Sequence, residues 1–210
     1  MTTPPTSQKP QHNGPTPPTS APLNNEIGII FGRKGSGKTT LARHIAARCK
    51  RVIILDTLGT DYGGGVVVTT PTDLRAYFAQ VREFGDFCII ARPRDQSLAD
   101  AYFRLVRESV NLTAIVEECD RYCSPWNIQP DLNWSINYGR QFGQTVIGCA
   151  RRPAGVHRTW TANADWVVAH QVQEPADVRY LQSIRGFDPD ELHNLPEFEW
   201  AMAGTSLINF

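Results

Sequence analysis

A glycine-rich segment around residue 35 has the residue types and spacing of a phosphate-binding loop. The pattern G-x-x-x-x-G-K-[ST] is matched at every fixed position by Gly32-Arg33-Lys34-Gly35-Ser36-Gly37-Lys38-Thr39. Glycines allow successive backbone N–H groups to face phosphate oxygens, and the N-terminus of the helix that follows adds its dipole. We expect Lys38 to reach the β- and γ-phosphates of a nucleotide and the Thr39 hydroxyl to ligate Mg²⁺. The predicted nucleotide-binding segment ends one residue later, at Thr40.

Two adjacent acids, Glu117 and Glu118, follow the apolar run 112–116. A nucleotide site needs one acid on the magnesium side and, for hydrolysis, a second group that orients the attacking water. We assign Glu117 to Mg²⁺ and Glu118 to the water. The alternative is that this acidic pair begins a solvated turn and has no catalytic role.

These residues need a scaffold that brings distant chain segments together, and the apolar runs predict one. Short runs typical of buried strands alternate with helical patterns, which indicates an α/β fold with a mainly parallel sheet flanked by helices. The expected strands are 27–31, 52–55, 66–69, 87–91, 113–116, 145–150 and 166–170. The expected helices are 38–49, 71–84, 95–110, 131–142 and 176–185, and 198–210 is expected to form a C-terminal hairpin that turns near Ala203-Gly204.

In a parallel sheet, functional residues gather beyond the carboxyl ends of the strands. The polar residues that follow the predicted strands are Asp56, Arg92, Glu117, Glu118, Arg151 and Arg152. We therefore expect these side chains to share one rim of the sheet with the phosphate-binding loop.

Composition limits the domain organisation and the partners. The 210 residues suffice for one α/β domain, 26–210, and the formal net charge of +0 provides no general attraction to nucleic acid. Residues 1–25 hold seven of the fifteen prolines and one charged side chain, Lys9, so we expect a disordered arm. No run approaches the roughly 18 apolar residues of a membrane span. The odd count of five cysteines indicates a reducing, cytoplasm-like compartment.

Several further segments resemble the FtsK–HerA class of DNA-pumping ATPases. Gly139-Arg140-Gln141-Phe142-Gly143 is similar to the Gly-Arg-x-x-Gly turn before the fourth core strand of that class, and Arg151-Arg152-Pro153 is similar to the Gln-Arg-Pro-like element after it. Asn163-Ala164-Asp165 sits where the class has an Asn before its last core strand. Asp177-Val178-Arg179-Tyr180-Leu181 is similar to an Asp-x-Arg-x-Leu helix start. The likeness extends over 26–185 and implies a P-loop NTPase core of the RecA/FtsK type.

The resemblance implies that the nucleotide is ATP and that it is hydrolysed with Mg²⁺. It makes Lys38 and Thr39 the ligands of nucleotide and metal, Glu118 the catalytic glutamate and Glu117 the magnesium-side acid. The class has Asp at the position of Glu117, so the additional methylene of this chain changes the reach toward the metal.

Three arginines receive catalytic roles only through the resemblance. Arg140 resembles an arginine finger that reaches the γ-phosphate bound by a neighbouring subunit. Arg151 takes the place of a polar sensor, usually Gln or Asn. Because a fixed cation replaces a neutral amide there, Arg151 is an alternative finger, and its neighbour Arg152 is a third candidate.

The short chain favours one branch of the class. A bare domain with a polar arm resembles the small genome-packaging ATPases of membrane-containing, tailless double-stranded DNA viruses. This implies a homo-oligomeric ring, a pentamer or a hexamer, that translocates double-stranded DNA in the host cytoplasm or as part of the virion, with a capsid vertex or a membrane protein as a further candidate partner. The alternatives are a small-molecule phosphotransferase, such as a nucleotide kinase, and a nucleotide-dependent switch protein. The acidic pair and Gly139-Arg140 favour the translocase, because a monomeric kinase requires neither.

Basic and aromatic residues at three predicted loops are candidate DNA contacts. Facing a central pore, such residues could follow phosphates and stack on bases. The alternative is solvated surface charge or pairing with acids. The clusters are Arg92-Pro93-Arg94, Arg121-Tyr122 with Trp126, and Arg151-Arg152 with His157-Arg158.

Overall fold

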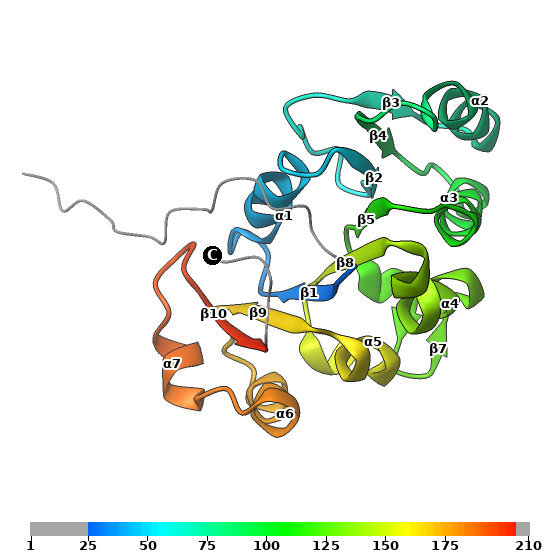
Figure 1. Cartoon of the computed structure of the whole chain (residues 1–210). Coiled ribbons are helices and arrows are strands. Elements are labelled where there is room, and N and C mark those ends of the chain that lie inside the picture. Colours follow the sequence, from blue (N-terminus) through cyan, green and yellow to red (C-terminus); the bar gives the residue numbers. More distant parts are fainter. Residues whose placement is uncertain (1–24, 205–210) are drawn as a thin grey trace, which may run out of the picture.

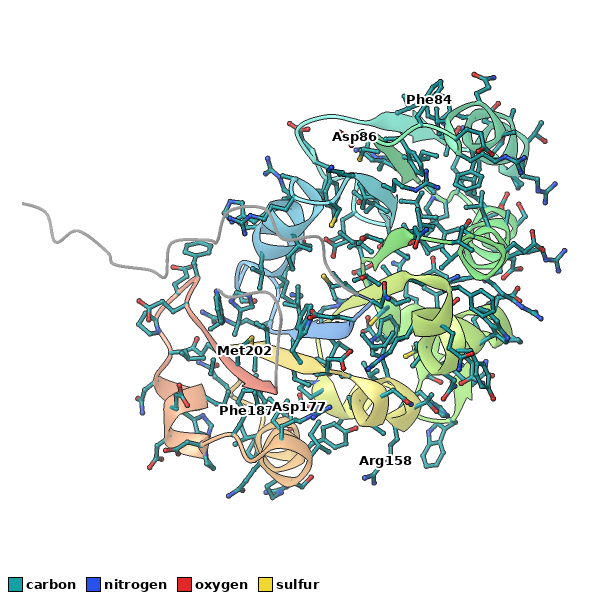
Figure 2. The ribbon with its side chains drawn as sticks, in the orientation of Figure 1. Phe84, Asp86, Arg158, Asp177, Phe187 and Met202 are labelled. Atoms are coloured by element: carbon teal, nitrogen blue, oxygen red, sulfur yellow. The ribbon has the colours of Figure 1, made fainter. Side chains whose placement is uncertain are left out.

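An eight-stranded sheet forms the centre of the computed structural model, which describes residues 25–204 (Figure 1). The strand order is β10-β9-β1-β8-β5-β2-β4-β3, and every neighbouring pair is parallel except β9 and β10. Met202 on β10 and Phe84 before β4 mark the two ends of this order (Figure 2). The strands are β1 (Ile27–Phe31), β2 (Arg51–Leu55), β3 (Val66–Val68), β4 (Phe87–Ala91), β5 (Leu112–Val116), β8 (Gln144–Ala150), β9 (Trp166–His170) and β10 (Trp200–Gly204).

Helices cover both faces of the sheet, and most of them lie on one face. Helix α1 (Lys38–Ala46) lies on the face opposite α2 (Pro71–Val81), α3 (Gln96–Glu108), α4 (Pro130–Tyr138) and α5 (Arg158–Asn163) (Figure 1). The remaining helices, α6 (Pro175–Arg185) and α7 (Pro189–Asn194), pack near β9 and β10. The predicted α/β fold, a mainly parallel sheet flanked by helices, is confirmed.

Two glycines in the central strands make room for tryptophan rings. A Cβ on Gly148 of β8 would lie 2.6 Å from the Trp160 ring, and a Cβ on Gly28 of β1 would overlap the Trp166 ring. Trp160 Nε1 also donates a hydrogen bond of 3.0 Å to the Gly28 carbonyl. Both indoles are fully buried, one in the apolar cluster on each face, so they fix the positions of the strands beside the phosphate-binding loop.

Several predicted boundaries were wrong at helix ends. Helix α1 ends at Ala46 rather than 49, because the next N–H groups bond three residues back, as at Cys49 N to Ala46 O (3.0 Å). Helix α2 ends at Val81 rather than 84. The expected helix 131–142 divides into α4 and the 3₁₀ turn η2 (Gly139–Phe142), which stops at Gly143 with φ 72°.

Short elements between the predicted ones were missed. They are α5, α7, the 3₁₀ turns η1 (Cys119–Arg121) and η3 (Pro153–Gly155), and the hairpin of β6 (Cys123–Ser124) and β7 (Asn127–Ile128). Each is at most six residues long, too short for a periodic apolar pattern to stand out.

The two ends of the chain are described only in part. Strand β10 pairs antiparallel with β9 as far as Ala203 and Gly204, so the turn expected at these two residues was wrong; the rest of the expected hairpin, 205–210, lies outside the described residues. The predicted disordered arm, 1–25, also lies outside them except for its last residue. Among residues 25–204, no helix has the length and apolar character that crossing a membrane requires.

Candidate nucleotide site

The glycine-rich loop connects β1 to α1 at the carboxyl edge of the sheet. Gly35 and Gly37 have φ of 81° and 104°, values that side chains other than glycine rarely adopt. Lys38 Nζ donates a hydrogen bond of 2.8 Å to the Arg33 carbonyl, which holds the ammonium over the loop. The Ser36 hydroxyl is buried and has no hydrogen-bond partner within the described part of the chain. This glycine-lined turn, with one cation and one unpaired hydroxyl, fits a polyphosphate.

His170, the last residue of β9, lies beneath the loop. A Cβ on Gly32 would be 2.8 Å from His170 Cβ, so only glycine fits at that position. Burial, with a smaller effect of the nearby charge of Lys38, lowers the pKa of His170 to about 4, although a 3.0 Å hydrogen bond to the Glu199 carbonyl opposes this shift. The imidazole is therefore neutral at pH 7 and donates from Nδ1 to Glu199.

The first acid, Glu117, is buried at the end of β5 and is 1% exposed. The Tyr62 hydroxyl donates a hydrogen bond of 2.7 Å to Glu117 Oε1. Burial raises the pKa of this carboxyl, and hydrogen bonds from Tyr62 and Thr39 together with the charge of Lys38 oppose the rise. Because the Thr39 hydroxyl and Glu117 meet, both predicted magnesium ligands lie at one point, and their oxygens suit Mg²⁺.

The second acid, Glu118, has an unusual backbone and three side-chain partners. Its φ and ψ are both 47°, the left-handed region that few residues with a Cβ adopt. Arg151 donates to Oε1 at 3.1 Å and the Thr57 hydroxyl donates to Oε2 at 3.0 Å, while the Arg121 guanidinium forms an ion pair with Oε2 at 3.0 Å. The strained backbone turns the carboxylate into the pocket, and the two guanidinium groups fix its direction.

One pocket joins the loop to both acids. Leu58, which is 53% exposed, lies at its mouth. The lining residues are Lys34, Gly35, Lys38, Thr39, Leu58, Glu117, Glu118, Cys149, Ala150 and Arg151.

The other residues of the predicted rim make pairs of their own. Arg92 donates to Asp56 at 2.9 Å and to the Thr60 carbonyl at 2.6 Å, so this pair shapes the segment that carries Tyr62. Arg152 pairs with Asp177 at 3.0 Å. Both pairs lie beside the pocket and do not line it.

Arg140 lies at the opposite edge of the sheet, in η2 immediately before β8. Its guanidinium contacts Asp165 Oδ2 at 2.6 Å and the Asn163 carbonyl at 3.0 Å. The seven residues of β8 separate Arg140 from the pocket, a distance of about 20 Å along the strand. Arg140 therefore cannot reach a phosphate held by the loop of its own chain.

Sequence reasoning did not assign a role to Tyr62 or to Thr57, which contact the two acids. Both lie in the connection from β2 to β3, whose sequence has no regular pattern. One sequence feature could have indicated a role for them: they follow β2 in the chain. Strand β2 lies next to β5, the strand that the two acids follow.

Comparisons with known proteins identify a partial family match and similar folds. Residues 29–91 match the model of the ATPase family associated with various cellular activities (AAA). No curated protein matches the chain. Among solved structures, the genome packaging NTPase B204 from Sulfolobus turreted icosahedral virus 2, in complex with ATP-gammaS, has a TM-score of 0.68 at 17% identity, covering 85% of this chain and 92% of B204.

Two bacterial proteins are also similar in structure. VirB4 of Thermoanaerobacter pseudethanolicus has a TM-score of 0.56 at 12% identity, covering 87% of this chain and 90% of VirB4. EssC from Geobacillus thermodenitrificans (ATPases 2 and 3) has a TM-score of 0.56 at 13% identity, covering 88% of this chain and 38% of EssC. At these identities the likeness establishes a shared fold, the P-loop ATPase core.

Proposed function

We propose that this chain hydrolyses ATP with Mg²⁺ and, as a homo-oligomeric ring of the FtsK–HerA class, translocates double-stranded DNA. The proposed role is the packaging of a viral genome, in the host cytoplasm or at the virion. A fold shared with the packaging NTPase B204 supports it, as do the B204 complexes with ATP-gammaS, AMPPCP and AMP.

The separation of Arg140 from the pocket carries the proposal of a ring. A finger at the amino edge of one chain can complete the site at the carboxyl edge of the next, and repetition of this head-to-tail contact closes a ring. Tyr138 and Phe142 flank Arg140 and are 52% and 42% exposed, which supplies apolar area for a second copy to cover. A solitary kinase has no need of this arrangement.

Hydrolysis follows from the groups in the pocket. Backbone N–H groups of the loop and the Lys38 ammonium bind the β- and γ-phosphates, while Thr39 and Glu117 hold the metal side. When bound, Mg²⁺ supplies further positive charge to these phosphates. Burial disfavours the charged form of Glu117. Bound Mg²⁺ and the Glu117 carboxylate therefore stabilise each other.

Glu118 orients the attacking water in this proposal. Its oxygens accept hydrogen bonds from Arg151 and Thr57 and form an ion pair with Arg121. A γ-phosphate close to Arg151 competes for that guanidinium and frees Oε1 to accept a proton from water. Arg151 is thereby a positioning residue in its own chain, and Arg140 remains the proposed finger in the neighbouring chain.

A link from Glu118 toward DNA runs through the β6–β7 hairpin. Trp126 at its tip is 93% exposed. Arg121, which pairs with Glu118, lies in η1 directly before this hairpin. We propose that Trp126 contacts DNA and that displacement of the hairpin changes the ion pair between Arg121 and Glu118. The other predicted DNA clusters are weaker candidates, because neither contains a large aromatic side chain as exposed as Trp126.

The test combines ATP hydrolysis, with and without double-stranded DNA, and the mass of the assembly. We expect DNA to stimulate hydrolysis and the stimulated species to be an oligomer. Trp126→Ala should retain basal hydrolysis and lose stimulation, while Phe84→Ala, which removes another exposed aromatic side chain, should lose neither. A fully active monomer that DNA does not affect would contradict the translocase and favour a kinase, whereas binding without turnover would favour a switch protein.

A further inference from the structure

Phe198 is an exposed aromatic residue with a costly backbone conformation. Its φ is 69°, and its side chain is 62% exposed. A bulky residue seldom adopts a positive φ, because its Cβ crowds the backbone, and an exposed ring offsets little of this cost by burial. Neither the sheet nor the apolar clusters account for a phenylalanine at this position.

The ring lies against the phosphate-binding loop. A Cβ on Gly37 would be 3.3 Å from Phe198 Cδ1 and 3.6 Å from its Cα. Phe198 is the one residue from outside the loop and the start of α1 that lines a second pocket, within the described part of the chain. The lining residues are Gly35, Ser36, Gly37, Lys38, Thr39, Thr40 and Phe198.

Two hydrogen bonds hold the turn that carries this ring. The Glu199 N–H donates to the Pro196 carbonyl at 3.1 Å, and His170 Nδ1 donates to the Glu199 carbonyl at 3.0 Å. Because His170 also packs beneath Gly32 and Gly37, the turn and the loop share one support. The ring is therefore held in place before any ligand arrives.

The two pockets lie on either side of the start of α1 and share Gly35, Lys38 and Thr39. The first contains Glu117 and Glu118, and so takes the γ-phosphate end of a nucleotide. The opposite end of the same nucleotide, with its ribose and base, must extend away from the acids. The second pocket shares Gly35, Lys38 and Thr39 with the first, contains neither acid, and is lined further by the exposed Thr40 and by Phe198, so the base end of the nucleotide can occupy it.

We infer that Phe198 is the stacking surface for the nucleotide base, and that it favours purines. Stacking of a base on an aromatic ring contributes affinity whichever base it is, because every base has a π-face. A purine covers more of the ring than a pyrimidine does, so purine nucleotides bind more tightly, while the choice between adenine and guanine depends on polar contacts elsewhere. This inference rests on the proposed nucleotide site.

The test compares ATP with tripolyphosphate, which has the phosphates and no base. In equilibrium binding to the full chain with Mg²⁺, Phe198→Ala should weaken ATP on the order of 10- to 100-fold, the range for loss of one stacked base, and leave tripolyphosphate unchanged. Phe198→Trp should restore ATP binding. Phe84→Ala is the matched control: Phe84 is 59% exposed and lies at the far end of the sheet (Figure 2).

A spectroscopic measurement gives a second readout. The fluorescence of 2-aminopurine riboside triphosphate should be quenched on binding to the wild type and not on binding to Phe198→Ala. Unchanged ATP affinity in Phe198→Ala, or an equal loss for tripolyphosphate, would overturn the stacking role. If the wild type binds neither ligand, the proposed nucleotide site itself fails.

Discussion

At the carboxyl edge of the sheet, polar side chains hold one another in a pocket. At the amino edge, Arg140 pairs with Asp165, and the exposed Tyr138 and Phe142 lie close to it in the sequence. Glu118 has three side-chain partners and a strained backbone. Arg140 has a single acidic partner and is 46% exposed. The first arrangement is preorganised for a ligand, whereas the second presents a cation on a surface suited to a partner.

This difference separates binding from turnover. The carboxyl edge of one chain contains the loop, Glu117, which we propose lies on the magnesium side, and Glu118, which we propose orients the water. We therefore expect this edge to bind a nucleotide alone. In the proposed mechanism, the charge that completes transition-state stabilisation is that of Arg140 at the other edge, and it is supplied by another chain. Substitutions at the two edges should thus affect different measured quantities.

The largest effect is expected from Lys38→Ala at the carboxyl edge. This change removes the cation of the loop, and both ATP binding and hydrolysis should fall below detection. Equilibrium binding and phosphate release measure the two effects. Lys50→Ala removes an exposed lysine just before β2 and should change neither. ATP affinity retained by Lys38→Ala would show that this edge is not the nucleotide site.

Glu118→Gln, at the same edge, should separate ATP binding from ATP hydrolysis. The amide keeps hydrogen-bonding capacity and loses the ability to accept a proton from water. We expect ATP affinity close to that of the wild type and hydrolysis reduced by at least about 100-fold, in the range of a lost general base. Normal turnover in this variant would transfer the catalytic role to Glu117.

Arg140→Ala tests the amino edge. The variant should fold, bind ATP and assemble, yet lose on the order of 10³-fold in turnover, the usual contribution of an arginine finger. Mixing it with Glu118→Gln subunits should restore part of the activity, because an interface between an intact Glu118 and an intact Arg140 can then form.

The control and the contrary outcome are specific to that edge. Arg75→Ala removes an exposed arginine on α2 and should retain full activity. Absence of rescue at every mixing ratio, or full activity in a dilute monomer, would leave Arg140 with only its structural contact to Asp165.

The two edges also differ in how far the sequence predicts them. Strand β1 and the loop after it follow from local order, since an apolar run, fixed glycines and Lys38 lie within a dozen residues. Tyr62 and Phe198 reach the site from segments without periodic pattern, and their positions depend on which strands become neighbours. Helix α5 has only six residues and could not be distinguished from a loop. The distance between Arg140 and the pocket emerges once the parallel order places β8 beside both β1 and β5.

The smallest expected effect concerns His170, a buried titratable side chain that supports the phosphate-binding loop at the carboxyl edge. Burial lowers its pKa to about 4 in the folded protein, against 6.5 in the unfolded chain. Between these values the unfolded state binds more protons, so the stability that neutral His170 provides is complete above pH 6.5 and is lost as the pH falls toward 4.

His170→Asn keeps a donor for the Glu199 carbonyl and cannot titrate. Urea unfolding of both proteins at pH 7 and pH 5 should therefore show a larger loss for the wild type, by on the order of 1–2 kcal/mol. Because the two proteins differ only at residue 170, the difference between their losses isolates the contribution of this side chain. Equal losses would mean that His170 has an ordinary pKa and that water reaches the support beneath the phosphate-binding loop.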